Sequence, residues 1–295
     1  LLLISGLASD SQSWPPVLAP LSLHHRLIAP DNRGSGRTPL GTPSLRVERM
    51  AEDCLALLDH LSLPRVSVLG HSLGGYIAQR LAIRWPDRVN RLILAGTAAS
   101  TSERNAALLK VWRETLGLVD REGWWRNLFA WILSRRFFSR PDDVAGAVRL
   151  ALDYPFATGD EAFKAQAEAI AAFDNREEAA SIGAKTLVLC GGEDIFIPPD
   201  ESEELHRLIP GSLLSILPGA AHSLHLENPA AFCSLVLEFL KSSGPLPRGA
   251  LARAFNKKSR FRRFSPLERG LCGRLPWGER TLKPPLEGAS HAETS

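Results

Sequence analysis

The 295-residue chain is poor in cysteine and has no long apolar segment. Its four cysteines, Cys54, Cys190, Cys233 and Cys272, lie far apart and form no C-x-x-C pair or metal-ligand cluster. We therefore expect free thiols in a reducing, cytoplasmic compartment, without a disulfide framework or a metal site. The longest apolar runs, such as residues 1–4, are far shorter than the ~20 residues of a membrane-spanning helix, so we predict no transmembrane segment.

The chain also lacks an initial methionine, and no basic residue precedes its short apolar start. We expect that the sequence begins inside a longer one or was trimmed, which leaves a targeting segment open. The length suits one large domain, or one domain with a small insertion. A hydrophobic share of 44% and a charged share of 23% are ordinary for a globular enzyme.

Charge is unevenly distributed along the chain. Residues 242–295 carry eleven Lys and Arg against four Glu, a net charge of +7, which leaves −4 for residues 1–241 of a chain whose total is +3. Pro, Gly, Ser and Arg dominate this segment without periodicity, so we predict a disordered tail. Residues 254–264 mix basic and aromatic side chains, a composition that can bind nucleic acid or an anionic membrane. A solvated extension is the simpler interpretation. We expect no nucleic-acid binding by the remainder, and the sequence does not indicate an oligomeric state.

Short runs rich in Leu, Ile and Val alternate with helical patterns before the tail. Such nearly continuous apolar runs are typical of strands that are buried on both faces. The runs are residues 1–5, 26–29, 66–69, 91–95, 186–190 and 213–217, and helices are predicted over residues 44–61, 72–85 and 228–240. The alternation predicts a mostly parallel sheet with right-handed crossovers.

Residues 101–180 interrupt this alternation. They contain about four helical patterns, no convincing strand and most of the aromatic residues, so we predict a helical lid inserted into a domain formed by residues 1–100 and 181–241. These aromatic side chains either pack the lid or line an apolar substrate pocket. They include Trp112, Trp124, Trp125, Trp131, Phe137, Phe138 and Phe163.

A G-x-S-x-G motif, formed by Gly70, Ser72 and Gly74, directly follows one predicted strand and opens a predicted helix. A serine on such a sharp strand-to-helix turn projects its hydroxyl above the sheet, and the positions two before and two after it must be very small. The turn also leaves the N–H of Leu73 at the helix start, where it can bind an oxyanion. The context predicts that Ser72 is a nucleophile.

A serine nucleophile requires a base, and the base requires an orienting acid. His222 follows the strand at residues 213–217 across a small-residue loop, at the strand end where open α/β sheets build their sites. His225 is the competing candidate. We place His60 and also His206 on helices and expect them to be solvated or packing residues. Asp194 follows the strand at residues 186–190 and is the predicted acid. The chain order Ser, Asp, His is the one associated with the nucleophile-elbow fold.

With these motifs in place, residues 1–241 resemble the α/β-hydrolase superfamily, and within it the lid-bearing esterases, lactonases and carbon–carbon bond hydrolases. Four segments carry the resemblance. Gly70-His71-Ser72-Leu73-Gly74-Gly75 is similar to the nucleophile elbow, Gly191-Gly192-Glu193-Asp194 with Pro198 to the acid loop, His222 with Glu227 and Pro229 to the histidine loop, and Asp31-Asn32-Arg33-Gly34-Ser35-Gly36 to the D-x-R-G-x-G turn.

The resemblance implies an α/β-hydrolase fold, a small-molecule substrate, no metal or organic cofactor, and a second oxyanion donor at the N–H of Leu7. Serine at the elbow argues against the epoxide-hydrolase and dehalogenase branches, which need a carboxylate there. His71 resembles esterases more than carbon–carbon hydrolases, which often carry Asn. Ser5-Gly6 replaces the frequent His-Gly pair and is similar to enol-lactone and aminoacrylate hydrolases.

We therefore expect a serine hydrolase that cleaves a small carboxylic ester, lactone or thioester through an acyl-enzyme on Ser72. A carbon–carbon bond, aminoacrylate or enol-lactone hydrolase with the same triad is an alternative, and a non-catalytic ligand-binding protein is another. Arg135, Arg136 and Arg140 of the predicted lid either face solvent or bind a substrate carboxylate.

Overall fold

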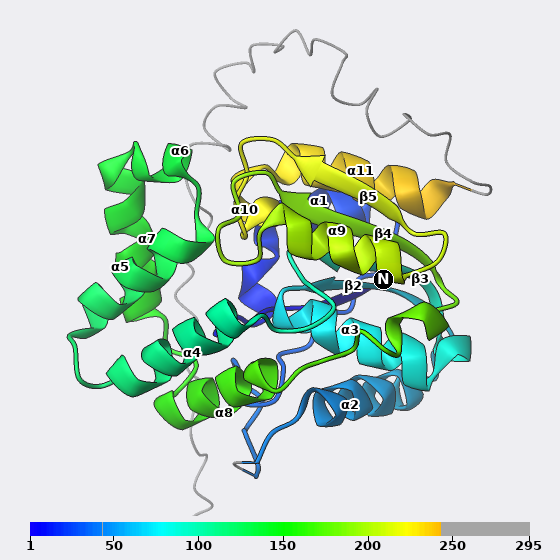
Figure 1. Cartoon of the computed structure of the whole chain (residues 1–295), viewed down its shortest axis with the longest axis horizontal. Helices are drawn as coiled ribbons and strands as arrows, with labels where there is room; N and C mark the ends of the chain where they lie inside the picture. The colour runs from blue at the N-terminus through cyan, green and yellow to red at the C-terminus, as the bar shows by residue number, and fades with distance from the viewer. Residues whose placement is uncertain (43, 243–295) are drawn as a thin grey trace, which may run out of the picture. The chain divides into compact units, whose positions relative to one another are not determined.

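The computed structural model of the protein describes residues 1–42 and 44–242 (Figure 1). Apart from Ser242, the predicted disordered tail lies outside these residues, as does Cys272. Cys54, Cys190 and Cys233 are buried free thiols. No helix in the described part of the chain has the length and apolar character needed to cross a membrane.

Five parallel strands form one sheet, and their order in the sheet follows their order in the chain. The central strands are almost completely buried, as their Leu-, Ile- and Val-rich sequences predict. The strands are β1 (Leu2–Ile4), β2 (Val66–His71), β3 (Val89–Ala95), β4 (Lys185–Gly191) and β5 (Leu213–Leu217).

The strand predicted at residues 26–29 is reduced to a single bridge, in which Ile28 pairs in parallel with Leu2. Its N–H donates to the carbonyl of Leu1 at 3.0 Å, and its carbonyl accepts the N–H of Leu3 at 2.8 Å. The run is only partly buried, and it ends at Pro30, which has no N–H to continue a ladder. This segment therefore borders β1 without forming a regular strand.

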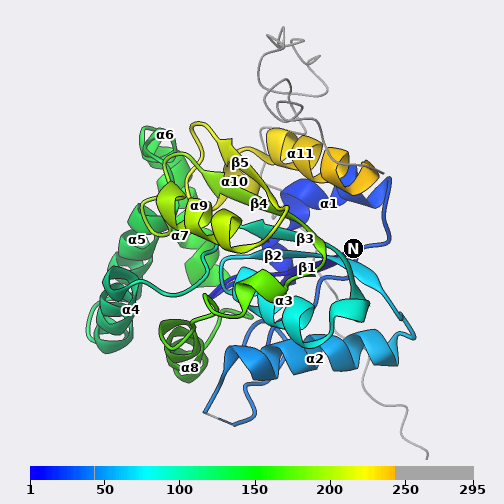
Figure 2. The same ribbon diagram turned by 45° about the vertical axis from the view of Figure 1, so that its right-hand side comes forward.

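Helices cover both faces of the sheet (Figures 1 and 2). Helices α1 and α11 pack on one face, around a core that includes Leu69, Ile93 and Phe232, whereas α2, α3 and α9 pack on the other. The predicted parallel α/β architecture is confirmed. The helices are α1 (Pro15–Ser22), α2 (Val47–His60), α3 (Leu73–Arg84), α9 (Pro199–Leu208), α10 (Leu224–Glu227) and α11 (Pro229–Lys241), with short 3₁₀ turns at Ser11–Ser13, Pro86–Arg88 and Ala179–Ser181.

A group of helices, hereafter the insertion, separates β3 from β4 and lies at the end of the sheet opposite the N-terminus (Figure 1). It contains five helices instead of the roughly four predicted, because α6 is a single turn that is too short for a periodic pattern. The Ser134 hydroxyl caps this turn by accepting the Phe137 N–H at 3.3 Å. The helices are α4 (Glu103–Thr115), α5 (Arg121–Ile132), α6 (Arg135–Phe138), α7 (Pro141–Asp153) and α8 (Asp160–Ala171).

Candidate active site

Ser72 stands alone between the end of β2 and the start of α3, in a strained backbone conformation. Its φ of 54° and ψ of −120° lie in a region that side chains rarely adopt. Its N–H donates to the carbonyl of Ala95 at 2.9 Å, which ties the turn to the end of β3. Only 6% of Ser72 is exposed. This is the strand–turn–helix geometry that the G-x-S-x-G motif predicts.

The glycines around Ser72 allow backbone segments to approach closely. A Cβ atom on Gly70 would lie 2.1 Å from the carbonyl oxygen of Gly74, and one on Gly74 would lie 2.0 Å from the carbonyl oxygen of Ile4. Both distances are impossible for real atoms, so only glycine fits either position. The segment after β1 also passes close to Ser72, since a Cβ on Gly6 would lie 3.2 Å from the Ser72 Cβ.

Asp194 lies in the tight turn after β4 and is almost fully buried. Its Oδ1 accepts the N–H groups of Phe196 and Ile197, both at 2.9 Å. Its Oδ2 lies 2.9 Å from Nδ1 of His222. The adjacent Glu193 is exposed. The carboxylate of Asp194 is thus fixed by three hydrogen bonds, one of which holds the His222 ring.

His222 follows the carboxyl end of β5. Because the strands are parallel, this is the same end of the sheet as the Ser72 turn after β2. Gly96 follows the Ala95 residue whose carbonyl binds Ser72, and a Cβ on Gly96 would lie 3.2 Å from the His222 carbonyl oxygen and 3.4 Å from its Nδ1. The ring of Phe196 meets the His222 ring edge-on, with centroids 5.0 Å apart. No hydrogen bond between described residues joins Ser72 directly to His222.

Two further histidines pack around this centre. The Nε2–H of His71 donates to the carbonyl of His222 at 2.9 Å. The His225 ring meets the His71 ring at a centroid distance of 4.5 Å and also contacts Trp14. Burial lowers the pKa of His71 well below its usual value, with smaller contributions from the charges of His225 and His222. Burial, followed by the His222 charge, lowers the pKa of His225 to about 3. Both rings are therefore neutral at pH 7.

The structure separates the competing histidines by their partners. His225 is buried, and neither of its ring nitrogens has a hydrogen-bond partner among the described residues. Nδ1 of His206 contacts the Ser212 hydroxyl at 2.8 Å. His60 is an exposed residue at the end of α2. Of the described histidines, only His222 has a carboxylate hydrogen-bonded to its ring. In residues 1–42 and 44–242, no group of three or more His, Cys, Asp or Glu side chains could hold a metal ion.

The backbone at Leu7 belongs to a short loop with several internal hydrogen bonds. The Gly6 carbonyl accepts the Ser9 N–H at 3.3 Å, and the Asn32 side chain donates to the Ser5 carbonyl at 2.9 Å. Because the peptide plane is trans, the Leu7 N–H points away from the Gly6 carbonyl and its turn. Leu73 is the first residue of α3, where an N–H has no acceptor within the helix.

Two side chains near the site, Glu227 and Tyr154, had no assigned role in the sequence interpretation. The Glu227 carboxylate accepts backbone N–H groups from Ala221 and from Ser134, both at 3.0 Å. The Tyr154 hydroxyl contacts the Asp10 carboxylate. Glu227 was visible in the histidine-loop motif, but no sequence pattern indicates its partner, which lies 93 residues away.

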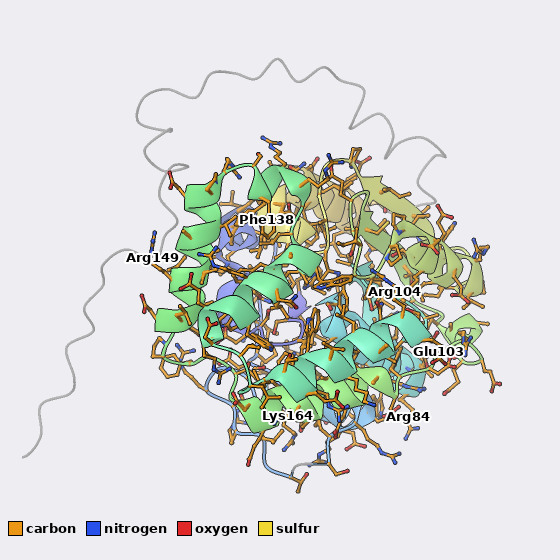
Figure 3. All side chains as sticks on the ribbon, turned by 60° about the vertical axis from the view of Figure 1, so that its left-hand side comes forward. Arg84, Glu103, Arg104, Phe138, Arg149 and Lys164 are labelled. Atoms are coloured by element: carbon orange, nitrogen blue, oxygen red, sulfur yellow. The ribbon has the colours of Figure 1, made fainter. Side chains whose placement is uncertain are left out.

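A groove of about 400 Å³ lies beside the acid turn. The insertion contributes Ala130, Leu133, Arg135 and Phe138, and the turn contributes Glu193 and Ile195. Arg104 of α4 donates to the Ile195 carbonyl at 2.6 Å. Figure 3 turns the insertion toward the viewer and labels Phe138 on α6 and Arg104 on α4. Arg135 is the only one of the three predicted lid arginines that lines this groove.

The model of the alpha/beta hydrolase fold family matches residues 1–229. The chain belongs to this family and is a hydrolase. A putative carbamate hydrolase, RutD, from Variovorax paradoxus is 32% identical over 247 residues, which cover 81% of this chain and 90% of that protein. The 3-oxoadipate enol-lactonase 2 of Acinetobacter baylyi is 29% identical over 244 residues, 82% of this chain and 88% of that protein. The resemblance expected from the motifs is confirmed.

Solved structures show the same fold. The enol-lactonase of Burkholderia xenovorans superposes with a TM-score of 0.74 at 29% identity, over 82% of this chain and 90% of that one. A hydrolase from Pseudomonas aeruginosa gives a TM-score of 0.75 at 29% identity, over 82% of this chain and 89% of that one. The predicted α/β-hydrolase fold is therefore confirmed.

Proposed function

We propose that the protein is a serine hydrolase that cleaves a small carboxylic ester or lactone through an acyl-enzyme on Ser72. One observation carries the proposal. The buried Asp194–His222 hydrogen bond and the strained Ser72 turn lie at the same end of the sheet, where the parallel strands finish. This arrangement supplies a nucleophile, a base and an acid that orients the base.

In the first step, the Ser72 hydroxyl attacks the substrate carbonyl, and Nε2 of His222 accepts the hydroxyl proton. Nδ1–H of His222 donates to Asp194 throughout, which keeps Nε2 free to act as the base and stabilises the imidazolium. The N–H groups of Leu73 and Leu7 stabilise the tetrahedral oxyanion. Each such donor typically contributes ~3 kcal/mol to lowering the barrier.

In the second step, the imidazolium of His222 protonates the leaving oxygen, and the acyl group stays on Ser72. A water molecule, deprotonated by His222, then attacks the acyl-enzyme, and the imidazolium returns the proton to the Ser72 oxygen as the acid is released. The proposed mechanism needs only these side chains and two backbone N–H groups, without a metal or an organic cofactor.

The proton transfer requires contact between Ser72 and His222, which are not hydrogen-bonded in this structure. Such contacts are often longer in free enzymes and tighten when substrate binds. Rotation of the Ser72 side chain is the smallest movement that changes this distance, because both backbones are fixed by hydrogen bonds.

We propose that the insertion acts as a lid that shapes an apolar acyl or aryl site. Trp112, Trp124 and Phe163 are buried, so much of its aromatic content packs its own core. Trp112 nevertheless contacts Phe196, which in turn contacts the His222 ring. This chain of rings favours a small apolar substrate group next to the base.

A carbamate is the second candidate substrate class, because one relative is named a putative carbamate hydrolase. The enol-lactonase among the relatives supports the lactone of the first proposal. Opening a lactone uses the same acyl transfer to Ser72, except that the leaving oxygen remains part of the acyl group because the two were joined in a ring. Carbon–carbon bond cleavage by the same triad is a further alternative, and it requires in addition that a carbon leaving group be protonated.

The decisive experiment compares the wild-type protein with Ser72→Ala on ester, thioester, lactone, carbamate and vinylogous-diketone substrates, together with fluorophosphonate labelling. We expect Ser72→Ala to abolish both labelling and turnover. Turnover that survives in Ser72→Ala would refute the nucleophile. A wild-type protein without any hydrolysis, but with ligand-induced thermal stabilisation, would favour a binding protein.

A further inference from the structure

The loop that carries His222 is hydrogen-bonded to the insertion on both sides of that residue. Before His222, the Ala221 N–H donates to Oε1 of Glu227 at 3.0 Å, and Oε2 of the same carboxylate accepts the Ser134 N–H at 3.0 Å. After His222, the Ser223 N–H donates directly to the Ile132 carbonyl at 3.1 Å. The turn between α5 and α6, residues 132–134, therefore anchors the base loop twice.

Glu227 is held firmly enough to act as a link. It is the last residue of α10, and its own N–H donates to the Ser223 carbonyl at 3.1 Å. The next residue, Asn228, caps α11. The buried Leu224 and Phe232 fix these two helices in the core. A rigid carboxylate that accepts two N–H groups transmits a displacement of either donor, and charge-assisted hydrogen bonds are stronger than neutral ones.

The same turn also contributes to the groove beside the acid. Leu133 and Arg135 line this groove together with Glu193 and Ile195, which flank Asp194. A substrate group that fills the groove would thus press on the segment that anchors the His222 loop.

We propose that Glu227 is a positioning residue that makes the placement of His222 depend on the α5–α6 turn of the insertion. The inference rests on the proposed function, because it assigns His222 as the base. It adds that substrate groups in the groove influence the rate of the chemical step as well as binding.

The first test is Glu227→Gln, which keeps the shape of the side chain. A glutamine has one acceptor oxygen and one donor NH₂, so one of the two N–H groups would face a donor. Displacing a catalytic group by about 1 Å can lower the rate about a hundredfold. We expect kcat and the fluorophosphonate inactivation rate to fall about tenfold, with KM changed less than twofold.

A second pair of variants isolates the other donor. Ser134 has a φ of −72° and the preceding Leu133 has a φ of −117° and a ψ of 150°, so proline fits at position 134. Ser134→Pro removes both the N–H and the capping hydroxyl, whereas Ser134→Ala removes the hydroxyl alone. We expect Ser134→Pro to have a kcat about fivefold below that of Ser134→Ala.

Hydrogen exchange gives a measure that is independent of activity. In Glu227→Gln, we expect faster exchange at the Ala221 and Ser134 amides and unchanged exchange in β2 and β4. Glu122→Gln is the matched control, since it removes a carboxylate that pairs with Arg126 on the exposed face of α5; it should keep wild-type kcat and exchange.

Wild-type kcat and exchange in Glu227→Gln, together with equal kcat in Ser134→Pro and Ser134→Ala, would overturn the inference, and so would an equal loss of kcat in Glu122→Gln. Failure of the proposed function has a different signature, namely full turnover by Ser72→Ala. The exchange at Ala221 and Ser134 tests the link to the insertion in either case.

Discussion

The Tyr154 hydroxyl donates a hydrogen bond to Oδ2 of Asp10 at 2.5 Å, across 144 residues of sequence. Tyr154 directly follows helix α7 of the insertion, and Asp10 lies in the loop that also contains Leu7. Partial burial and the Asp10 carboxylate raise the pKa of Tyr154, so the phenol remains a donor at neutral pH. The insertion is thus bonded to the proposed oxyanion loop as well as to the His222 loop.

Removing this hydroxyl should loosen the oxyanion loop. In Tyr154→Phe, the Asp10 carboxylate keeps one hydrogen-bond donor among the residues that the structure describes, the N–H of Gln12. A lost hydrogen bond of this kind typically costs about 1–3 kcal/mol. We expect kcat for ester hydrolysis to fall about three- to tenfold and exchange at residues 7–13 to accelerate. If neither quantity changes, the loop does not depend on Tyr154.

Local sequence signals identified the elbow and the order of the proposed triad, because each of these features depends on a few neighbouring residues. Gly70 is required by a contact with Gly74 inside the turn, whereas Gly74 is required by the carbonyl of Ile4, which the sheet brings there from a distant part of the chain. The bonds of the insertion were not predictable, since the Tyr154–Asp10 and Ser134–Glu227 contacts join residues far apart in the chain. Patterns within a few neighbouring residues do not indicate which distant residue a side chain will contact.

Asp194→Asn should separate catalysis from folding at the acid. The amide oxygen can still accept the Phe196 and Ile197 N–H groups, so the turn and the melting temperature should change little. The amide NH₂ would face Nδ1 of His222 and force the proton onto Nε2, which is the wrong tautomer for a base. We expect kcat to fall roughly 10³–10⁴-fold.

Steady-state kinetics and thermal melting test this expectation, and Asp200→Asn on the exposed start of α9 is the matched control. A variant at position 194 with more than a tenth of wild-type kcat would mean that Asp194 does not orient the base.

Two glycine variants should distinguish a structural requirement from a catalytic one. A Cβ at Gly74 would meet the Ile4 carbonyl at 2.0 Å, so Gly74→Ala must push β1 and α3 apart and should prevent stable folding. A Cβ at Gly6 meets the Ser72 Cβ at 3.2 Å and His71 Nδ1 at 3.3 Å, distances that small shifts relieve. We expect Gly6→Ala to fold and to lose about tenfold or more in kcat, since the shift moves the Leu7 N–H. Circular dichroism and kinetics separate the two outcomes, and a fully active Gly6→Ala would exclude a close role for this loop.

Acid should destabilise the protein through its buried histidines. In the folded protein, the pKa of His225 is about 3 because the ring is buried, whereas an unfolded histidine titrates near 6.5. Between these values the unfolded chain binds a proton that the folded chain does not, so the free energy of unfolding falls as the pH falls. The contribution of this one group is up to about 1.4 kcal/mol per pH unit. His71 acts in the same direction.

Urea unfolding between pH 7 and pH 4 measures this slope. His225→Leu removes the titrating ring, so its stability should depend less steeply on pH than that of the wild type, whatever its absolute stability at pH 7. His24→Gln, in the exposed turn after α1, changes a histidine outside the buried cluster and should keep the wild-type slope. Equal slopes in the wild type and His225→Leu would show that His225 takes up its proton in the folded state, which requires solvent or a carboxylate to reach a ring that is only 2% exposed.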